Sequence, residues 1–137
     1  MVRRWIHESP ARWDEEKESV LGAAPAGALE VDALRGASLL PGDWWRVEED
    51  GRTVAYGTMD AVWGDAEILV AVRPESQGQG LGAFVLAKLE EEARAQGLRY
   101  LYNVVRPTHP RGEAVTKWLL GRGFKPSEEG GVLRRRT

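Results

Sequence analysis

The sequence predicts a mixed α/β fold: a twisted, mostly antiparallel sheet of about six to seven strands, flanked by about four helices. In the first half, strand-like runs are joined by tight turn signals such as Asp50-Gly51, which favour antiparallel hairpins. In the second half, apolar strand runs alternate with helical patterns, which is typical of crossover connections. The chain has 137 residues, enough for one core and too few for two, so we expect residues 1–137 to form a single domain.

The first half is expected to begin with a strand and a helix. Ser9 is suited to cap that helix, Pro10 to occupy its first position, and Gly22 to end it. The next stretch is rich in Ala, Gly and Pro, which predicts loops around one short helix. The elements expected here are a strand at 2–7, a helix from Ser9 to Gly22, a short helix near 31–34, and hairpin strands at 44–49 and 53–63.

The second half is expected to alternate strands and helices. The longest helix is indicated by Leu81, Phe84, Val85 and Leu89, which recur on one helical face. Gly97 is a suitable stop for it. The elements expected here are strands at 66–72 and 100–105, helices at 83–94 and 113–120, a strand from Gly123-Phe124, a turn at Gly130-Gly131, and a return strand at 132–135.

Composition excludes several classes of function. The net charge is -2 with a pI near 5.8, so no overall basic field attracts nucleic acid or a membrane surface. The chain has no cysteine and only two histidines, which argues against disulfides, thiolate chemistry and a metal site. No apolar run approaches the length of a membrane span, and the N-terminus lacks a signal-peptide core. We therefore expect a cytoplasmic protein that binds no metal, nucleic acid or membrane.

The most informative segment is a glycine loop between a strand and a helix. Three glycines, Gly78, Gly80 and Gly82, follow Pro74 at alternate positions and lead directly into the long helix. Such a loop presents unpaired backbone N–H groups at the positive end of a helix dipole, which suits a phosphate or pyrophosphate. Two other interpretations are a dinucleotide-binding fingerprint and a simple helix cap. The first requires a loop after the first strand and an acidic residue about 20 positions later, and this loop lies mid-chain without one.

The segment resembles the acyl-CoA-binding motif of the GCN5-related N-acetyltransferases. That family pattern is Val-x-Pro, then Gln or Arg, two residues, Gly, one residue, and Gly or Ala. Its places are filled by Val72, Pro74, Gln77, Gly80 and Gly82. The order of expected elements is also that of the family, so the resemblance covers essentially the whole chain. It implies acetyl-CoA as co-substrate and a primary amine, of a small molecule or a protein, as acceptor.

The resemblance also implies which residues hold the co-substrate. Backbone N–H groups of the loop would bind the pyrophosphate, and the preceding strand would splay from the next one so that its backbone pairs with the pantetheine arm. A backbone N–H in the same region would polarise the thioester carbonyl. The residues concerned are Val70, Ala71 and Val72 in the strand, and Gln77, Gly78, Gln79, Gly80, Leu81 and Gly82 in the loop.

Catalytic groups are harder to place. Glu67 is the closest carboxylate to the motif and the candidate general base, although strand alternation turns it to the face opposite Val72. Many family members carry a tyrosine four residues before the Gly of Gly123-Phe124, and here that place is Leu119. His109 is the candidate for protonating the leaving thiolate, with water as the alternative.

Three functions stay open at this point. The leading one is an N-acetyltransferase; the second is a CoA-binding module with weak catalysis, because the tyrosine is missing; the third is a nucleotide-binding domain. The resemblance places the acceptor beside the 44–63 hairpin, where Trp44, Trp45 and Trp63 could contact it. We expect a monomer or a homodimer.

Overall fold

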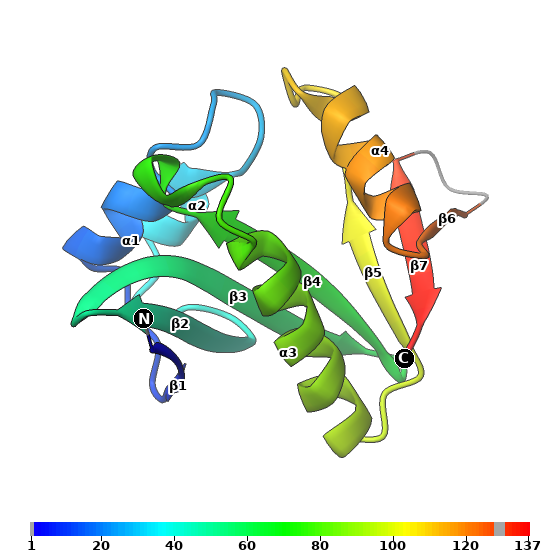
Figure 1. Cartoon of the computed structure of the whole chain (residues 1–137), viewed down its shortest axis with the longest axis horizontal. Coiled ribbons are helices and arrows are strands. Elements are labelled where there is room, and N and C mark those ends of the chain that lie inside the picture. The colour runs from blue at the N-terminus through cyan, green and yellow to red at the C-terminus, as the bar shows by residue number, and fades with distance from the viewer. Residues whose placement is uncertain (1, 128–130) are drawn as a thin grey trace.

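The computed structural model describes residues 2–127 and 131–137, and within them the strands form one seven-stranded sheet of order β1-β2-β3-β4-β5-β7-β6 (Figure 1). Neighbouring strands are antiparallel except β4 and β5, which are parallel. The mixed, mostly antiparallel sheet expected from the sequence is therefore confirmed. The strands are β1 (Arg3–Glu8), β2 (Asp43–Glu49), β3 (Arg52–Val62), β4 (Asp65–Val72), β5 (Tyr100–Val104), β6 (Lys125–Pro126) and β7 (Val132–Arg136).

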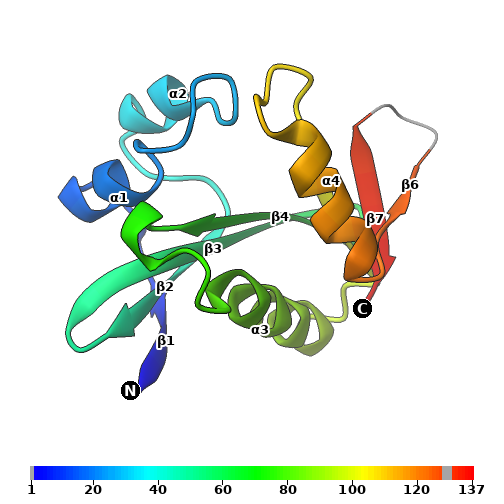
Figure 2. The same cartoon turned by 45° about the horizontal axis from the view of Figure 1, so that its top comes forward.

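Helices cover both faces of the sheet. On one face, α1 and α2 lie over β3 and β4, and α3 lies on the other face (Figure 2). Buried residues of α3 and α4 share one core with the strands, whereas a second core joins α1 to Trp44 and Tyr56. The four helices in the described residues are α1 (Glu15–Val20), α2 (Val31–Arg35), α3 (Leu81–Ala95) and α4 (Gly112–Gly121), and a 3-10 turn spans Pro74–Ser76.

The strands β4 and β5 pair only at one end. Their parallel register runs from the pair Asp65 and Tyr100 to the pair Glu67 and Tyr102, while β4 itself continues to Val72. Beyond Glu67 the two strands part, and Figure 1 shows them diverging. The splayed pair that the family resemblance implied is therefore present.

The first helix begins later than expected. Asp14, not Ser9, is its N-cap, and the Asp14 carboxylate accepts a hydrogen bond from the Lys17 N–H at 2.8 Å. Residues before it cannot wind into a helix because the Ala11 carbonyl accepts from the Leu40 N–H at 2.9 Å, which ties this segment to the loop before β2. Gly130 of the predicted turn lies outside the described residues, and β6 is only a short strand.

The two adjacent tryptophans of β2 face opposite sides of the sheet. Trp44 is buried in the α1 core, where its indole N–H donates to the Pro41 carbonyl at 2.9 Å. Trp45 lies in the α3 core and stacks on Trp5 with ring centroids 5.5 Å apart. This follows from the two-residue period of a strand. Only one of the pair can therefore border a cleft on the α1 face.

Candidate active site

The glycine loop presents a run of unused backbone donors. Among the described residues, no hydrogen bond uses the N–H groups of residues 78–83, which span the loop and the first turn of α3. Gly80 caps the helix with φ 78°, a left-handed conformation that favours glycine, and a side chain added there would meet open space. The Gln77 N–H differs, because it donates to the Pro74 carbonyl at 3.4 Å. The loop can thus direct several donors at one anion.

Residues distant in the sequence hold this loop. The Arg3 guanidinium donates to the Gln79 carbonyl at 2.6 Å and also bonds Glu49 at 2.8 Å, so β1 fixes the direction of the loop carbonyl. On the other side, the Trp118 ring of α4 lies 3.4 Å from where a side chain at Gly82 would begin. An alanine there would make ordinary contact with this ring, whereas a longer side chain would have to displace it.

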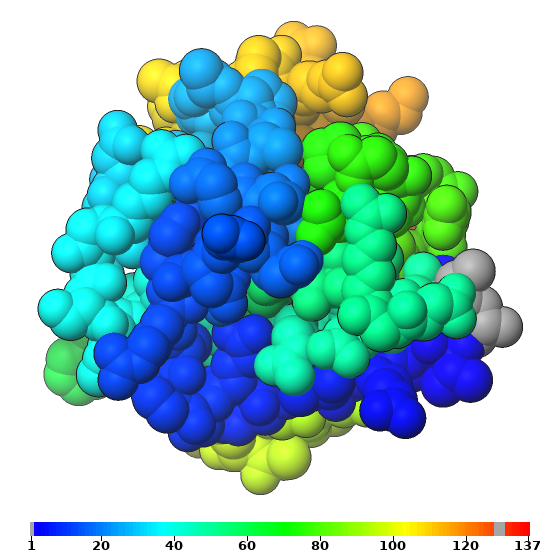
Figure 3. Space-filling view, turned by 90° about the vertical axis from the view of Figure 1, so that its left-hand side faces the viewer, coloured from blue at the N-terminus to red at the C-terminus, as the bar shows by residue number. Residues whose placement is uncertain are grey.

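The segment before the loop is anchored by a buried arginine. Arg73 donates to the Thr53 carbonyl at 2.8 Å and to the Glu16 carboxylate at 2.6 Å. Figure 3 shows α1 (blue) beside the segment that follows β4 (green). The end of β4 is therefore fixed both to β3 and to α1, which positions the loop that comes next.

The parting of β4 from β5 leaves one edge of β4 unpaired. The Ile68 carbonyl points towards β5, because it accepts a hydrogen bond from the Asn103 amide at 3.1 Å. The Arg73 N–H points the opposite way, to Val54 on β3. Since backbone groups alternate between the two edges of a strand, those of Val70 and Val72 point into the gap. Those of Ala71 point towards β3, so only two of the three predicted strand residues offer backbone groups there.

On the α1 face, a cleft of about 410 Å³ lies against this same gap. Glu67 is in it, together with Asp60, its cross-strand neighbour on β3. The strand alternation predicted from the sequence does turn Glu67 away from Val72, and that is the face on which this cleft opens. The other lining residues are mostly apolar and come from α2, from β2 to β5 and from the loops before α2 and β2, among them Leu34, Trp44 and Leu69.

The charge of this cleft is mainly negative. Its acidic lining residues are Glu30, Asp60 and Glu67, and Arg106 is its basic one. Arg106 pairs with Glu30 at 2.7 Å across the gap between the loop before α2 and the loop after β5. A second contact, from the Thr108 hydroxyl to the Gly27 carbonyl at 2.6 Å, joins the same two loops. The cleft is therefore bridged on one side and suits a cationic group.

His109 lies apart from Glu67. It lines a separate hollow at the start of α4, and Arg106 borders both hollows. The His109 Nδ1 accepts a hydrogen bond from the Arg111 N–H at 2.9 Å, so the neutral ring carries its proton on Nε2. Leu119 is 2% exposed and belongs to the core that α4 shares with α3, so it does not face either hollow.

Several of these residues could not be predicted from local sequence patterns. Arg3 lies 76 positions from Gln79, and no local pattern connects them. Asn103 was not predicted to have a role, yet its amide bridges the two strands where they part. One signal for Asn103 is present in the sequence: it is an amide in a strand whose other residues are apolar or aromatic. A polar side chain that is partly buried in such a strand needs a hydrogen-bond partner.

The described residues include neither a group of side chains suited to a metal ion nor a helix suited to spanning a membrane. Within residues 2–127 and 131–137, no three His, Asp or Glu side chains are grouped in a way that could hold a metal ion. In the same residues, no helix has the length and apolar character that crossing a bilayer requires.

A family model decides what kind of protein carries this site. The model described as the acetyltransferase (GNAT) family matches residues 3–119, from the start of β1 into α4. The chain belongs to this family. The family expectation from the Val72-to-Gly82 segment is thereby confirmed.

Individual GNAT relatives are similar over part of their length. An amino-acid acetyltransferase of Ectopseudomonas mendocina (strain ymp) is 35% identical over 85 residues, which cover 59% of this chain and 18% of that protein. The fold resembles N-acetylglutamate synthase from Neisseria gonorrhoeae, complexed with coenzyme A and N-acetyl-glutamate, with a TM-score of 0.69 at 18% identity over 97% of this chain and 35% of that one. PaiA N-acetyltransferase from Thermoplasma acidophilum, in complex with coenzyme A, has a TM-score of 0.60 at 14% identity over 69% of this chain and 60% of that one. The chain thus spans less than two thirds of each.

Proposed function

We propose that this GNAT chain transfers the acetyl group of acetyl-CoA to a primary amine bound in the cleft at Glu67. One observation carries the proposal: the free edge of β4 leads directly into the run of unused N–H donors at residues 78–83. These donors would hold the pyrophosphate, and the backbone of Val70 and Val72 would hold the pantetheine arm. Acetyl-CoA, when bound, supplies an acetyl group activated as a thioester.

The cleft supports the acceptor side of the reaction. A lysine-like amine is neutral in only about one molecule in 10³–10⁴ at pH 7, so attack requires loss of a proton. Glu67, the last β4 residue paired with β5, is the carboxylate proposed to take that proton, directly or through water. The new C–N bond forms as the C–S bond breaks, and the departing thiolate takes a proton from water. Asp60 and Glu30 add negative charge that favours a cationic acceptor.

A matched pair of glycine variants tests the loop assignment. Gly80→Glu places bulk and negative charge among the unused donors, so calorimetry should show acetyl-CoA affinity reduced at least tenfold, about 1.4 kcal/mol. Gly97→Glu is the control, since Gly97 also has a left-handed backbone (φ 74°) and open space around it, but lies beyond the other end of α3. Equal affinities in a folded Gly80→Glu protein would falsify the loop assignment.

Release of CoA thiol with a panel of amines tests the activity itself. We expect cationic amines with an aliphatic body to be acetylated faster than amino acids that carry extra carboxylates. A protein that binds acetyl-CoA but acetylates no amine would instead fit a CoA-binding module.

A further inference from the structure

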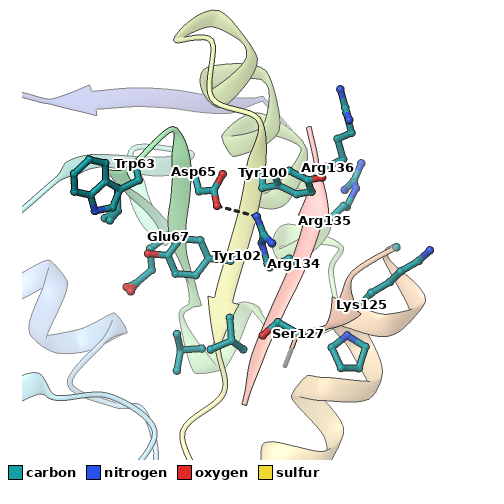
Figure 4. A pocket seen from close by; sticks show the side chains of 15 residues that line it. Trp63, Asp65, Glu67, Tyr100, Tyr102, Lys125, Ser127, Arg134, Arg135 and Arg136 are labelled. Atoms are coloured by element: carbon teal, nitrogen blue, oxygen red, sulfur yellow. Dashed lines mark hydrogen bonds and ion pairs between the residues drawn. The ribbon is translucent and has the colours of Figure 1, made fainter. Parts of the chain in front are cut away.

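Beyond the cleft, one face of the sheet lies open across β4, β5 and β7. A groove of about 1320 Å³ runs over it (Figure 4). Strand register places the side chains of this face in rows: Asp65, Tyr100 and Arg136 in one, and Glu67, Tyr102 and Arg134 in the next. Each row therefore passes from an acid, over a tyrosine, to an arginine.

The groove is continuous with the cleft proposed for the acceptor. Glu67 and Val104 line both. In Figure 4, Glu67 lies beside Tyr102 at the edge of the groove that β4 forms. A molecule with its amine at Glu67 could thus extend over β5 and β7 without crossing a helix.

The charges of the groove differ from those of the cleft. Arg134 pairs with Asp65 at 2.9 Å, and its guanidinium lies 4.2 Å from the centre of the Tyr100 ring. Arg136 is exposed, and within the described residues no ion pair involves it. Cationic side chains over aromatic rings suit carboxylates and apolar groups. The cleft favours a cation and the far side of the groove an anion.

Trp63 stands at the end of the groove and is fully exposed. It forms the hairpin tip between β3 and β4 with φ 52°, in a left-handed region that large side chains rarely adopt. Packing within this chain does not account for a tryptophan there, and an exposed aromatic at the edge of a groove is typical of a contact surface.

We propose, resting on the acetyl transfer proposed above, that the acceptor is the amino group of a peptide or protein segment whose following residues, acidic and apolar, lie along this groove. Glu67 and Arg134 share one row, two strand spacings or about 10 Å apart, and Arg136 lies one row further along, so an extended peptide spans this distance in about four residues. Acidic side chains about three to five residues beyond the amine would then reach Arg134 and Arg136, and an apolar side chain of the same peptide that turns back to the β4 side of the groove would contact Trp63. Charge complementarity and continuity with the cleft favour this occupant.

Matched peptides test the proposal. Two heptapeptides share a free amino terminus and a terminal phenylalanine; one carries glutamate, the other lysine, at its fourth and fifth residues. Calorimetry in the presence of CoA measures their binding, and thiol release measures their acetylation, with the dipeptide of the same first two residues as the minimal acceptor. The variants are Trp63→Gly, which the left-handed backbone accommodates, and Arg136→Glu. Arg4→Glu, on β1 at the opposite edge of the sheet, is the charge control.

We expect the glutamate peptide to bind at least tenfold more tightly than the lysine peptide. Arg136→Glu should abolish or reverse that preference, and Trp63→Gly should weaken binding of both peptides about tenfold. Acetylation of the dipeptide should be the same in all variants, and Arg4→Glu should leave the binding of both heptapeptides unchanged. Equal binding of the two peptides would overturn the groove assignment. So would a Trp63→Gly protein that binds both peptides as before and differs only in being a monomer where the parent is a dimer. In either case, acetylation of the dipeptide would still support the proposed acetyl transfer. A third outcome is that no acceptor is acetylated, while the glutamate peptide still binds more tightly and Arg136→Glu removes that preference. The groove assignment would then be supported and the proposed acetyl transfer would be wrong.

Discussion

The Asn103 amide donates a hydrogen bond to the Ile68 carbonyl at 3.1 Å, one residue beyond the last paired position of β4 and β5. It replaces a backbone bond that the sheet would otherwise make at this point. The side chain therefore ends the pairing while still linking the strands. The free edge of β4 begins directly after it.

We expect Asn103→Leu to be folded but less stable, because the substitution keeps the shape and leaves the Ile68 carbonyl without its donor. The loss should be about 1–3 kcal/mol in the free energy of unfolding measured with denaturant. Acetyl-CoA affinity should fall as well, since the spacing of β4 and β5 is no longer fixed. Unchanged stability and affinity would show that the bond does not set the gap.

Much of the fold follows from local signals, and the exception has a physical cause. The Asp50-Gly51 turn, with φ 53° and 76°, forms as predicted because its residue types tolerate left-handed backbone. The predicted start of α1 was wrong. Ser9-Pro10 and Asp14 are both suitable helix starts, and the hydrogen bond from the Leu40 N–H to the Ala11 carbonyl decides in favour of Asp14. That bond joins segments far apart in the sequence.

The candidate site divides in the same way. The loop donors could be predicted because glycine, strand and helix signals adjoin in the sequence. The support from Arg3 and the role of Asn103 could not, since both depend on which strands become neighbours. The motif thus indicates what is bound, and tertiary contacts determine how the loop and the gap are held.

Glu67→Gln should lower kcat about 10²-fold or more, because the amide cannot accept the proton of the amine. The KM for acetyl-CoA should stay the same, and the pH–rate profile should lose the limb set by the base. Asp60→Asn, at the cross-strand neighbour, is the control and should mainly raise the acceptor KM. Similar kcat losses in the two variants would assign the effect to the charge of the cleft and not to proton transfer.

Tyr56 predicts a specific alkaline behaviour. Burial, with the negative charges of Asp14, Glu8 and Glu16 as further causes, raises the pKa of Tyr56 well above its ordinary value. An unfolded tyrosine ionises near pH 10, so its contribution to stability is fully present below about pH 10 and declines as the pH rises further.

Tyr56→Phe should remove the part of the loss in stability above about pH 10 that comes from ionisation of this tyrosine. At neutral pH we expect the free energy of unfolding to be unchanged or about 1 kcal/mol higher, because the buried hydroxyl has no hydrogen-bond partner among the described residues. The ring contact with Lys17, 5.1 Å from the ammonium, is retained. Denaturant unfolding at pH 7 and pH 10.5 measures both effects, with Tyr100→Phe on the open face as control. A loss above about 1 kcal/mol at pH 7 would contradict the assignment.

The last helix offers no proton donor at the place where many GNAT members carry a tyrosine. Leu119 packs beside Phe124, whose N–H donates to the Leu119 carbonyl at 3.1 Å. Leu119→Tyr should therefore overpack the core, costing about 1–3 kcal/mol of stability, and should not raise kcat. A stable variant with a clearly higher rate would show that this side chain can reach the thiolate after all.

Water is then the expected proton source, since a CoA thiol with a pKa near 8.5, like that of cysteine, leaves as a fair thiolate. His109 is the side chain whose removal tests this. Its ring lines a hollow separate from that of Glu67, and its Nδ1 is engaged by the Arg111 N–H. We expect His109→Ala to keep kcat within about threefold and to retain both limbs of the pH–rate profile, whereas a general acid contributes about 10²-fold or more. A loss of that size, with acetyl-CoA binding intact, would assign the proton to His109 and require its loop to move towards the cleft.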